Sequence, residues 1–157
     1  MFGTDTGGGT CTDDTHADEC TGSLVTTLRA GDAPVVIEGV LPTLSDSDWF
    51  TIEIPPDSMT TMQGVGTASL VLDGDATTVM EIRDSCDATL PLACGEGVST
   101  AREITEYTFV DDQGMPDEPG AESYSTRDVP WPSFLVVRVG RRGGPATCMP
   151  YTLTVSR

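Results

Sequence analysis

Two pairs of aspartates are the first residues in this chain whose types and spacing could do chemistry. Asp46 and Asp48 directly precede the aromatic start of an alternating stretch in "SDSDWFTIEI", and Asp111 and Asp112 follow the stretch "EITEYTFV". Paired carboxylates can serve as acid and base on a glycosidic bond, or they can hold calcium, which prefers oxygen ligands. Aspartates at such positions also commonly accept hydrogen bonds from nearby backbone N–H groups. We expect no catalysis here, and we take calcium as the candidate ligand of all four residues.

Cysteines are the second group with possible chemistry. A disulfide is expected between Cys86 and Cys94, because "DATLPLA" between them suits a strand, a turn and a second strand. Cys20 is expected to pair with Cys11 or with Cys148, and since five is an odd number, one cysteine stays unpaired or bonds another chain. Five cysteines without a CxxC pair in a chain of 157 residues favour an oxidising compartment.

Zinc is an alternative for the first two cysteines. Cys11, His16 and Cys20 form the pattern C-x4-H-x3-C, and thiolates and imidazoles are zinc ligands. The pattern supplies only three local ligands, and the surrounding residues offer little apolar material to hold them in place. A disulfide is therefore the preferred interpretation.

Three aromatic residues could stack on a sugar or peptide ligand. They are Trp49, Tyr124 and Trp131. Trp131 lies between two prolines in "VPWPS", which predicts an extended backbone there. The alternative for Trp131 is a lid packed over one end of the fold, with the indole buried for stability.

Several kinds of enzyme are excluded by the residues that are missing. His16 is the only histidine, and it lies in a segment with little apolar content, so a Ser-His-Asp arrangement would lack a scaffold for its base. No GxSxG, HExxH or phosphate-binding loop occurs, and all eight basic residues are arginine, which removes Schiff-base chemistry. We expect that the protein is not an enzyme.

Charge restricts the partners. The formal net charge is -17, so phosphate backbones and anionic membrane surfaces are repelled, and we expect neither nucleic-acid binding nor membrane insertion. Cations are natural partners for such a surface, and calcium is the expected cofactor if there is one. The alternative is that the acidic surface only keeps the protein soluble. An extracellular polysaccharide or protein remains a possible ligand, and the domain is expected to be monomeric.

These residues must be positioned by β-strands. Residues 1–22 are rich in Gly, Thr and Asp and predict a flexible acidic linker, whereas 23–157 predict one β-sandwich domain with a long loop at 111–131. No stretch keeps a helical apolar period for three turns. The fold class is all-β, an antiparallel and jelly-roll-like sandwich of eight or nine short strands with little or no helix. The expected strands are 23–29, 35–41, 49–54, 67–73, 77–83, 89–94, 103–110, 133–140 and 151–157.

Alternation along these strands predicts which side chains form the core. Phe50, Ile52 and Ile54 share one face of their strand, and Tyr151, Leu153 and Val155 share one face of theirs. The pair Asp73-Gly74 is a strong turn signal, because glycine accepts the positive φ of hairpin turns. We therefore expect strands 67–73 and 77–83 to pair as a hairpin.

Three stretches resemble the bacterial pre-peptidase C-terminal domain, a β-sandwich module of secreted proteins. They are "SDSDWFTIEI", "SLVLDGDATTVMEIRDSC" and the ending "FLVVRVG...YTLTVS", and the resemblance covers about residues 35–157. The chain departs from the family at Pro150, where a glycine is usual, in the longer loop after Val110, and in its cysteines.

The resemblance implies a non-catalytic accessory or adhesion module of an exported protein, sometimes removed during maturation. Related collagen-binding modules take calcium through acidic residues ahead of the sandwich, and the corresponding segment here contains Asp13, Asp14, Asp18 and Glu19. The expected location is secreted or in the cell envelope. The segment "GTDTGGG" is also similar in composition to the spacer behind a lipoprotein leader.

Overall fold

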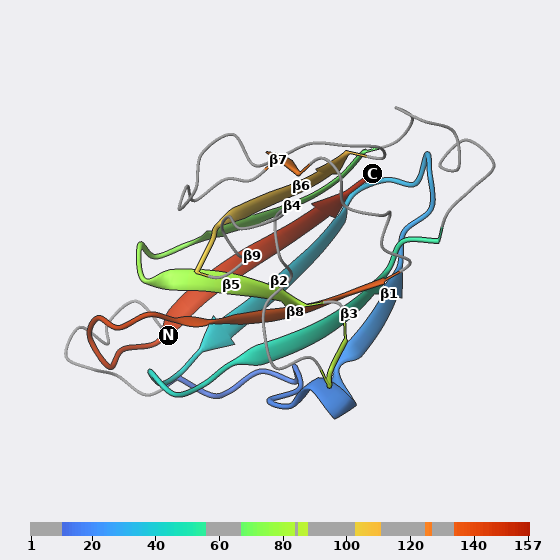
Figure 1. Ribbon diagram of the computed structural model, residues 1–157. Coiled ribbons are helices and arrows are strands. Elements are labelled where there is room, and N and C mark those ends of the chain that lie inside the picture. Colours follow the sequence, from blue (N-terminus) through green and yellow to red (C-terminus); the bar gives the residue numbers. More distant parts are fainter. Residues whose placement is uncertain (1–10, 56–66, 84, 88–102, 111–124, 127–133) are drawn as a thin grey trace.

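Two β-sheets packed face to face form the described part of the chain in this computed structural model (Figure 1). The structure describes residues 11–55, 67–83, 85–87, 103–110, 125–126 and 134–157. Within these ranges, no helix is long and apolar enough to cross a membrane. The elements are η1 (Cys20–Gly22), β1 (Leu24–Thr27), β2 (Val35–Leu41), β3 (Asp48–Glu53), β4 (Thr67–Gly74), β5 (Thr78–Arg83), β6 (Glu106–Val110), β7 (Ser125–Thr126), β8 (Phe134–Arg141) and β9 (Met149–Ser156).

The strand order confirms the predicted sandwich. One sheet has the order β1-β3-β8-β5 and the other has the order β2-β9-β4-β6-β7. From β2 to β5, each consecutive strand lies in the other sheet, which is the interleaved arrangement of jelly rolls. Most pairs are antiparallel, whereas the short edge strands β1 and β7 run parallel to their neighbours. The predicted strand at 89–94 lies outside the described residues.

The core lies between the sheets and follows the predicted alternation. The inward-facing side chains of β3 and β9 are buried, whereas Thr51 is half-buried and Glu53 is exposed. The predicted core residues that are buried are Phe50, Ile52, Ile54, Tyr151, Leu153 and Val155. Apolar residues of strands from both sheets complete the same cluster. Burial of one face of each strand therefore explains the alternation in the sequence.

The predicted hairpin between residues 67–73 and 77–83 is wrong. β4 pairs with β6 and β9, whereas β5 pairs with β8 in the opposite sheet. The chain does turn where Asp73-Gly74 indicated, and Thr78 donates its backbone N–H to the Asp75 carbonyl at 2.9 Å. The turn crosses from one sheet to the other, because both strands have apolar side chains that need the shared core. A turn signal predicts the reversal but not the sheet in which the next strand pairs.

The segment 11–22, the described part of the predicted linker, is packed against the sandwich. Asp14 accepts the backbone N–H of Val40 at 2.7 Å, and the His16 ring bonds the backbone carbonyl of Glu38 at 2.7 Å. Both backbone groups belong to the edge strand β2. The polar side chains of this segment thus form hydrogen bonds with backbone groups at the edge of β2. A low apolar content therefore did not mean that the segment lacks contacts with the sandwich.

Two disulfides join this segment to distant parts of the chain. Cys11 is bonded to Cys148, and Cys20 is bonded to Cys86. The predicted pairs Cys86–Cys94 and Cys11–Cys20 are therefore wrong, as is the alternative Cys20–Cys148, and Cys94 lies outside the described residues. Short spacing favoured local bridges, but the fold brings residues 66 and 137 positions apart into bonding range. Disulfides of this kind are typical of proteins outside the reducing cytoplasm.

Candidate metal centre

The predicted site residues fall into two groups. Asp46, Asp48 and Trp49 are described, whereas the other predicted calcium and ligand-binding residues lie outside the described ranges. The latter are Asp111, Asp112, Tyr124 and Trp131. Calcium binding by Asp111 and Asp112 together with Asp46 and Asp48 thus stays a prediction.

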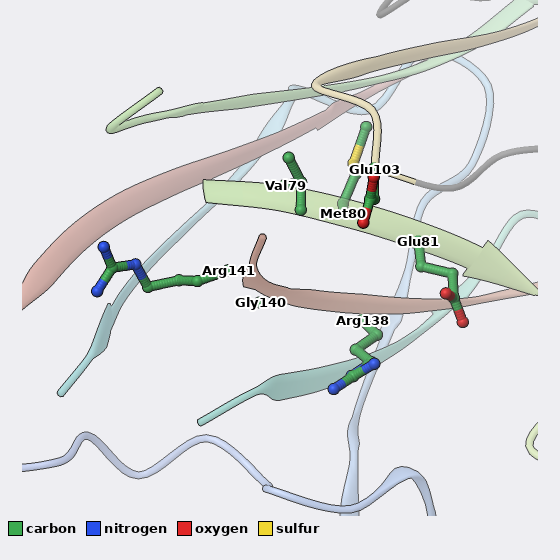
Figure 2. A pocket seen from close by; sticks show the side chains of 7 residues that line it. All are labelled: Val79, Met80, Glu81, Glu103, Arg138, Gly140 and Arg141. Carbon is green, nitrogen blue, oxygen red and sulfur yellow. The ribbon is translucent and has the colours of Figure 1, made fainter. Parts of the chain in front are cut away.

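Trp49 lies on the outer face of the four-stranded sheet beside two arginines. The guanidinium carbons of Arg83 and Arg138 lie 5.4 and 5.7 Å from the centre of its ring, which is the range of cation–π contacts. A pocket of about 100 Å³ opens over neighbouring parts of β5 and β8, with Glu81 and Arg138 in its wall (Figure 2). Binding sites for small molecules are usually about 300 Å³ or larger. We therefore assign this pocket no ligand.

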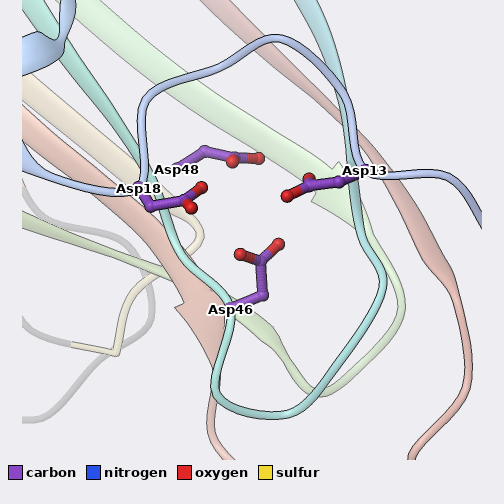
Figure 3. Close-up of side chains that lie close together, drawn as sticks. All are labelled: Asp13, Asp18, Asp46 and Asp48. Atoms are coloured by element: carbon purple, nitrogen blue, oxygen red, sulfur yellow. The ribbon is translucent and has the colours of Figure 1, made fainter.

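Four carboxylates converge at one end of the sandwich (Figure 3). They belong to Asp13, Asp18, Asp46 and Asp48, and one oxygen from each lies within 4.8 Å of the corresponding oxygens of the other three. We call this group the acidic cluster. The first two residues come from the N-terminal segment, whereas Asp48 is the first residue of β3 and Asp46 lies two residues before it. The cluster therefore joins regions of the chain that the sequence separates by about thirty residues.

Backbone contacts hold the two halves of the acidic cluster together. The N–H of Trp49 donates to the carbonyl of Ala17 at 2.9 Å, and these residues form an isolated antiparallel bridge. Asp18 and Asp48 are the chain neighbours of the two bridged residues, so this contact brings their backbones side by side. The disulfide of Cys20 ties down the segment two residues later. The position of Asp18 is thus set by backbone geometry and a covalent bond.

Asp48 is the most constrained member of the acidic cluster. Its side chain is fully buried, and its Oδ2 accepts a hydrogen bond from the hydroxyl of Tyr151 at 2.5 Å. Its Oδ1 is also buried but has no hydrogen-bond partner among the described residues. The same holds for Oδ2 of Asp46. Buried carboxylate oxygens without donors are rare, because leaving them unpaired is costly.

The surroundings of these two aspartates favour their neutral forms in the absence of a cation. Burial, together with the charges of Asp13 and Asp18, raises the pKa of Asp46 to about 6. Burial raises the pKa of Asp48 to about 7, with smaller contributions from Asp14 and Asp46, although the bond from Tyr151 acts in the opposite direction. A bound cation would remove this penalty by neutralising the carboxylates.

The donor set and its size fit calcium. Calcium binds oxygen at about 2.3–2.6 Å, so ligands on opposite sides of the ion are at most about 5 Å apart, and the cluster meets this limit. Four carboxylates leave room for water or carbonyl oxygens in a shell of about six to eight ligands. The zinc alternative is wrong, because Cys11 and Cys20 are both in disulfides and the His16 ring bonds a backbone carbonyl.

We expect the stability of the metal-free protein to rise as the pH falls from about 8 to about 5. Since folding raises the pKa of Asp48 from 3.8 to about 7, the folded state binds more protons than the unfolded chain in this range. The penalty of the buried charge is complete above pH 7, and it decreases steadily as the pH falls below that value toward the ordinary pKa of 3.8. Thermal melts in EDTA across this range measure the effect.

The matched control for this pH effect is Asp48→Asn, which keeps the shape of the side chain but cannot titrate. Its melting temperature should change less between pH 8 and 5 than that of the parent protein. If the parent is most stable at pH 8 in EDTA, the expected direction is wrong.

Sequence reasoning found half of the acidic cluster. Asp46 and Asp48 were predicted as calcium ligands, but Asp13 and Asp18 entered only through the resemblance to modules that bind calcium ahead of the sandwich. The excess of carboxylates before the first strand was the available signal. This excess did not show that the segment lies beside Asp46 and Asp48, because the contact depends on a β-bridge between Ala17 and the distant Trp49.

A scan against protein-family models found no match, and a search of the curated proteins found none either. The resemblance to the pre-peptidase C-terminal domain therefore stays a prediction, and the fold and the acidic cluster are the basis for any statement about function.

Proposed function

We propose that this chain is a calcium-stabilised, non-catalytic β-sandwich module that serves as an accessory or adhesion domain of an exported protein. One observation carries the calcium assignment: Asp48, a member of the acidic cluster, is fully buried, and its Oδ1 has no hydrogen-bond partner among the described residues. A divalent cation supplies the positive charge that the cluster lacks.

The cation acts as a clamp in this proposal. Asp13 and Asp18 are exposed residues of the N-terminal segment, and Asp46 and Asp48 belong to the sandwich. An ion shared by both pairs ties the segment to the start of β3. The stability of the folded module then depends on the calcium concentration. Exported modules meet high calcium concentrations outside the cell. Weak sites suffice there, with dissociation constants of about 0.1 to 1 mM.

Other features support an exported accessory module. Two disulfides suit an oxidising compartment. The only histidine bonds the backbone carbonyl of Glu38 at 2.7 Å, so its ring helps to hold the N-terminal segment against β2. The resemblance to the pre-peptidase C-terminal domain points the same way. Extracellular polysaccharide or protein is the ligand class expected for an adhesion domain.

Calcium should raise the melting temperature, and EDTA should reverse the rise. A cation at about 100 times its dissociation constant stabilises the folded state by about 2.7 kcal/mol. For a chain of this size, that is a rise of about 5–10 °C. Differential scanning calorimetry at pH 7.5 with about 10 mM calcium, which is about 100 times a dissociation constant of about 0.1 mM, and then with excess EDTA measures it.

The double variant Asp13→Asn/Asp18→Asn removes two exposed ligands and should abolish this response. The variant Glu38→Gln/Asp73→Asn loses the same charge at exposed positions outside the acidic cluster and should keep the response. A parent protein with no calcium shift refutes the proposal, and so does an equal response in both variants.

A further inference from the structure

The outer face of the five-stranded sheet has an apolar row beside an acidic row. Val36, Thr154 and Val71 lie opposite one another across β2, β9 and β4. Two residues further along each strand, Glu38, Thr152 and Asp73 form the next row on the same face. We call these six residues the β2–β9–β4 face.

The apolar row of this face is open to solvent. Val36 is 59% exposed and Val71 is 41% exposed, and both are among the large apolar side chains most exposed in the described structure. The threonine between them is half-buried. Two valines separated by one threonine form a small apolar strip, which is costly to leave in water and suits contact with aliphatic groups.

The acidic row borders a groove of about 740 Å³. Glu38, Asp73 and Asp75 line this groove. Gly39 and Gly74 line it as well, and they have no side chains that would fill it. Thr77 donates hydrogen bonds to the carboxylate of Asp75, which lower its pKa and keep it ionised. None of the described residues that line the groove is basic. The groove therefore offers concentrated negative charge next to the apolar strip.

We propose that the β2–β9–β4 face and its groove bind an extended, basic segment of a partner protein. Charge complementarity selects arginine or lysine for the groove, and the valines receive the aliphatic stems or small apolar side chains of the same segment. The two rows are about 6.7 Å apart along the strands, which matches the repeat between alternate side chains of an extended chain. This proposal does not depend on calcium binding.

A labelled peptide tests the proposal directly. The probe is a peptide of about eight residues with the repeat Arg-Ser-Val-Ser, in which arginine and valine lie two positions apart and therefore share one face of an extended chain, and fluorescence anisotropy at about 50 mM salt measures its affinity. We expect saturable binding to the full chain. A peptide with glutamate in place of arginine should not bind.

Variants locate the binding face. Glu38→Gln/Asp73→Asn should weaken peptide binding by about tenfold or more. The matched control Glu19→Gln/Glu53→Gln removes the same charge from exposed positions outside the groove and should change the affinity less than about twofold. Val36→Ser/Val71→Ser should also weaken binding, with the charge unchanged. All three variants alter exposed residues, and circular dichroism melts verify folding.

Several results overturn this proposal. One is the absence of saturable binding by the arginine peptide. A second is an equal loss of affinity in both charge variants, which shows that only net charge attracts the peptide. A third is peptide binding that the valine variant leaves unchanged. Neutral polysaccharide that competes for the same face would reassign it to a carbohydrate. The calcium melts remain interpretable under each of these outcomes, because the two sites share no ligand residue.

Discussion

Replacing Cys20 and Cys86 together by serine is expected to lower the free energy of unfolding by about 4 kcal/mol. The bridge spans 66 residues, so it restricts the unfolded chain strongly and also holds the end of the N-terminal segment beside the sandwich. For a chain of this size, the loss is about 8–16 °C in melting temperature. Urea denaturation without reductant measures the change.

The variant Cys94→Ser is the matched control, because it removes a cysteine and leaves both described bridges intact. A non-reducing peptide map of the parent protein should contain the cross-links Cys20–Cys86 and Cys11–Cys148. Detection of a Cys86–Cys94 cross-link would contradict the structure. The double serine variant should also respond more weakly to calcium, since Asp18 lies two residues from the lost bridge.

Gly39→Ala is expected to destabilise the protein by about 3 kcal/mol or more. Gly39 lies opposite Tyr151 in the pair β2–β9, and a Cβ at this position would overlap the phenol ring and hydroxyl of that tyrosine. Because Tyr151 is buried and its hydroxyl donates to Asp48, any shift of the ring also removes the one donor of that buried carboxylate among the described residues. Chemical denaturation measures the change.

A double-mutant cycle separates this overlap from other effects of alanine. In a Tyr151→Leu background the ring is absent, so Gly39→Ala should cost much less than in the parent protein. Gly74→Ala is a useful comparison, since an added Cβ there meets its nearest neighbours at 3.3 Å and needs only small shifts. If Gly39→Ala has the same effect in both backgrounds, contact with Tyr151 is not the cause.

The strands were predictable because their pattern is a local consequence of burial. In β3 and β9, every second residue faces the core, and the alternation of apolar and polar side chains records this directly. The predicted boundaries of β2 match the structure, and those of β3 and β9 differ from it by one or two residues. Such patterns need no knowledge of which strands are neighbours.

Pairing was not predictable in the same way. The turn after Asp73 reverses the chain whether the next strand joins the same sheet or the opposite one, and the structure has the second arrangement. The disulfide partners were not predictable from local sequence for the same reason. Cys86 has a nearby cysteine in the sequence, but the fold places Cys20 beside it. Short spacing is a poor guide where long-range packing brings distant residues together.

The acidic cluster combines both kinds of information. Local sequence was enough to place Asp46 and Asp48 at the start of a core strand and to indicate an oxygen-rich site, because turn residues and alternation act over a few positions. Their partners Asp13 and Asp18 depend on a β-bridge, two disulfides and side-chain bonds to the edge of β2. The burial of Asp48 against Tyr151 joins residues 103 positions apart. Contacts of this range arise only when both sheets pack around one core, so no local pattern contains them.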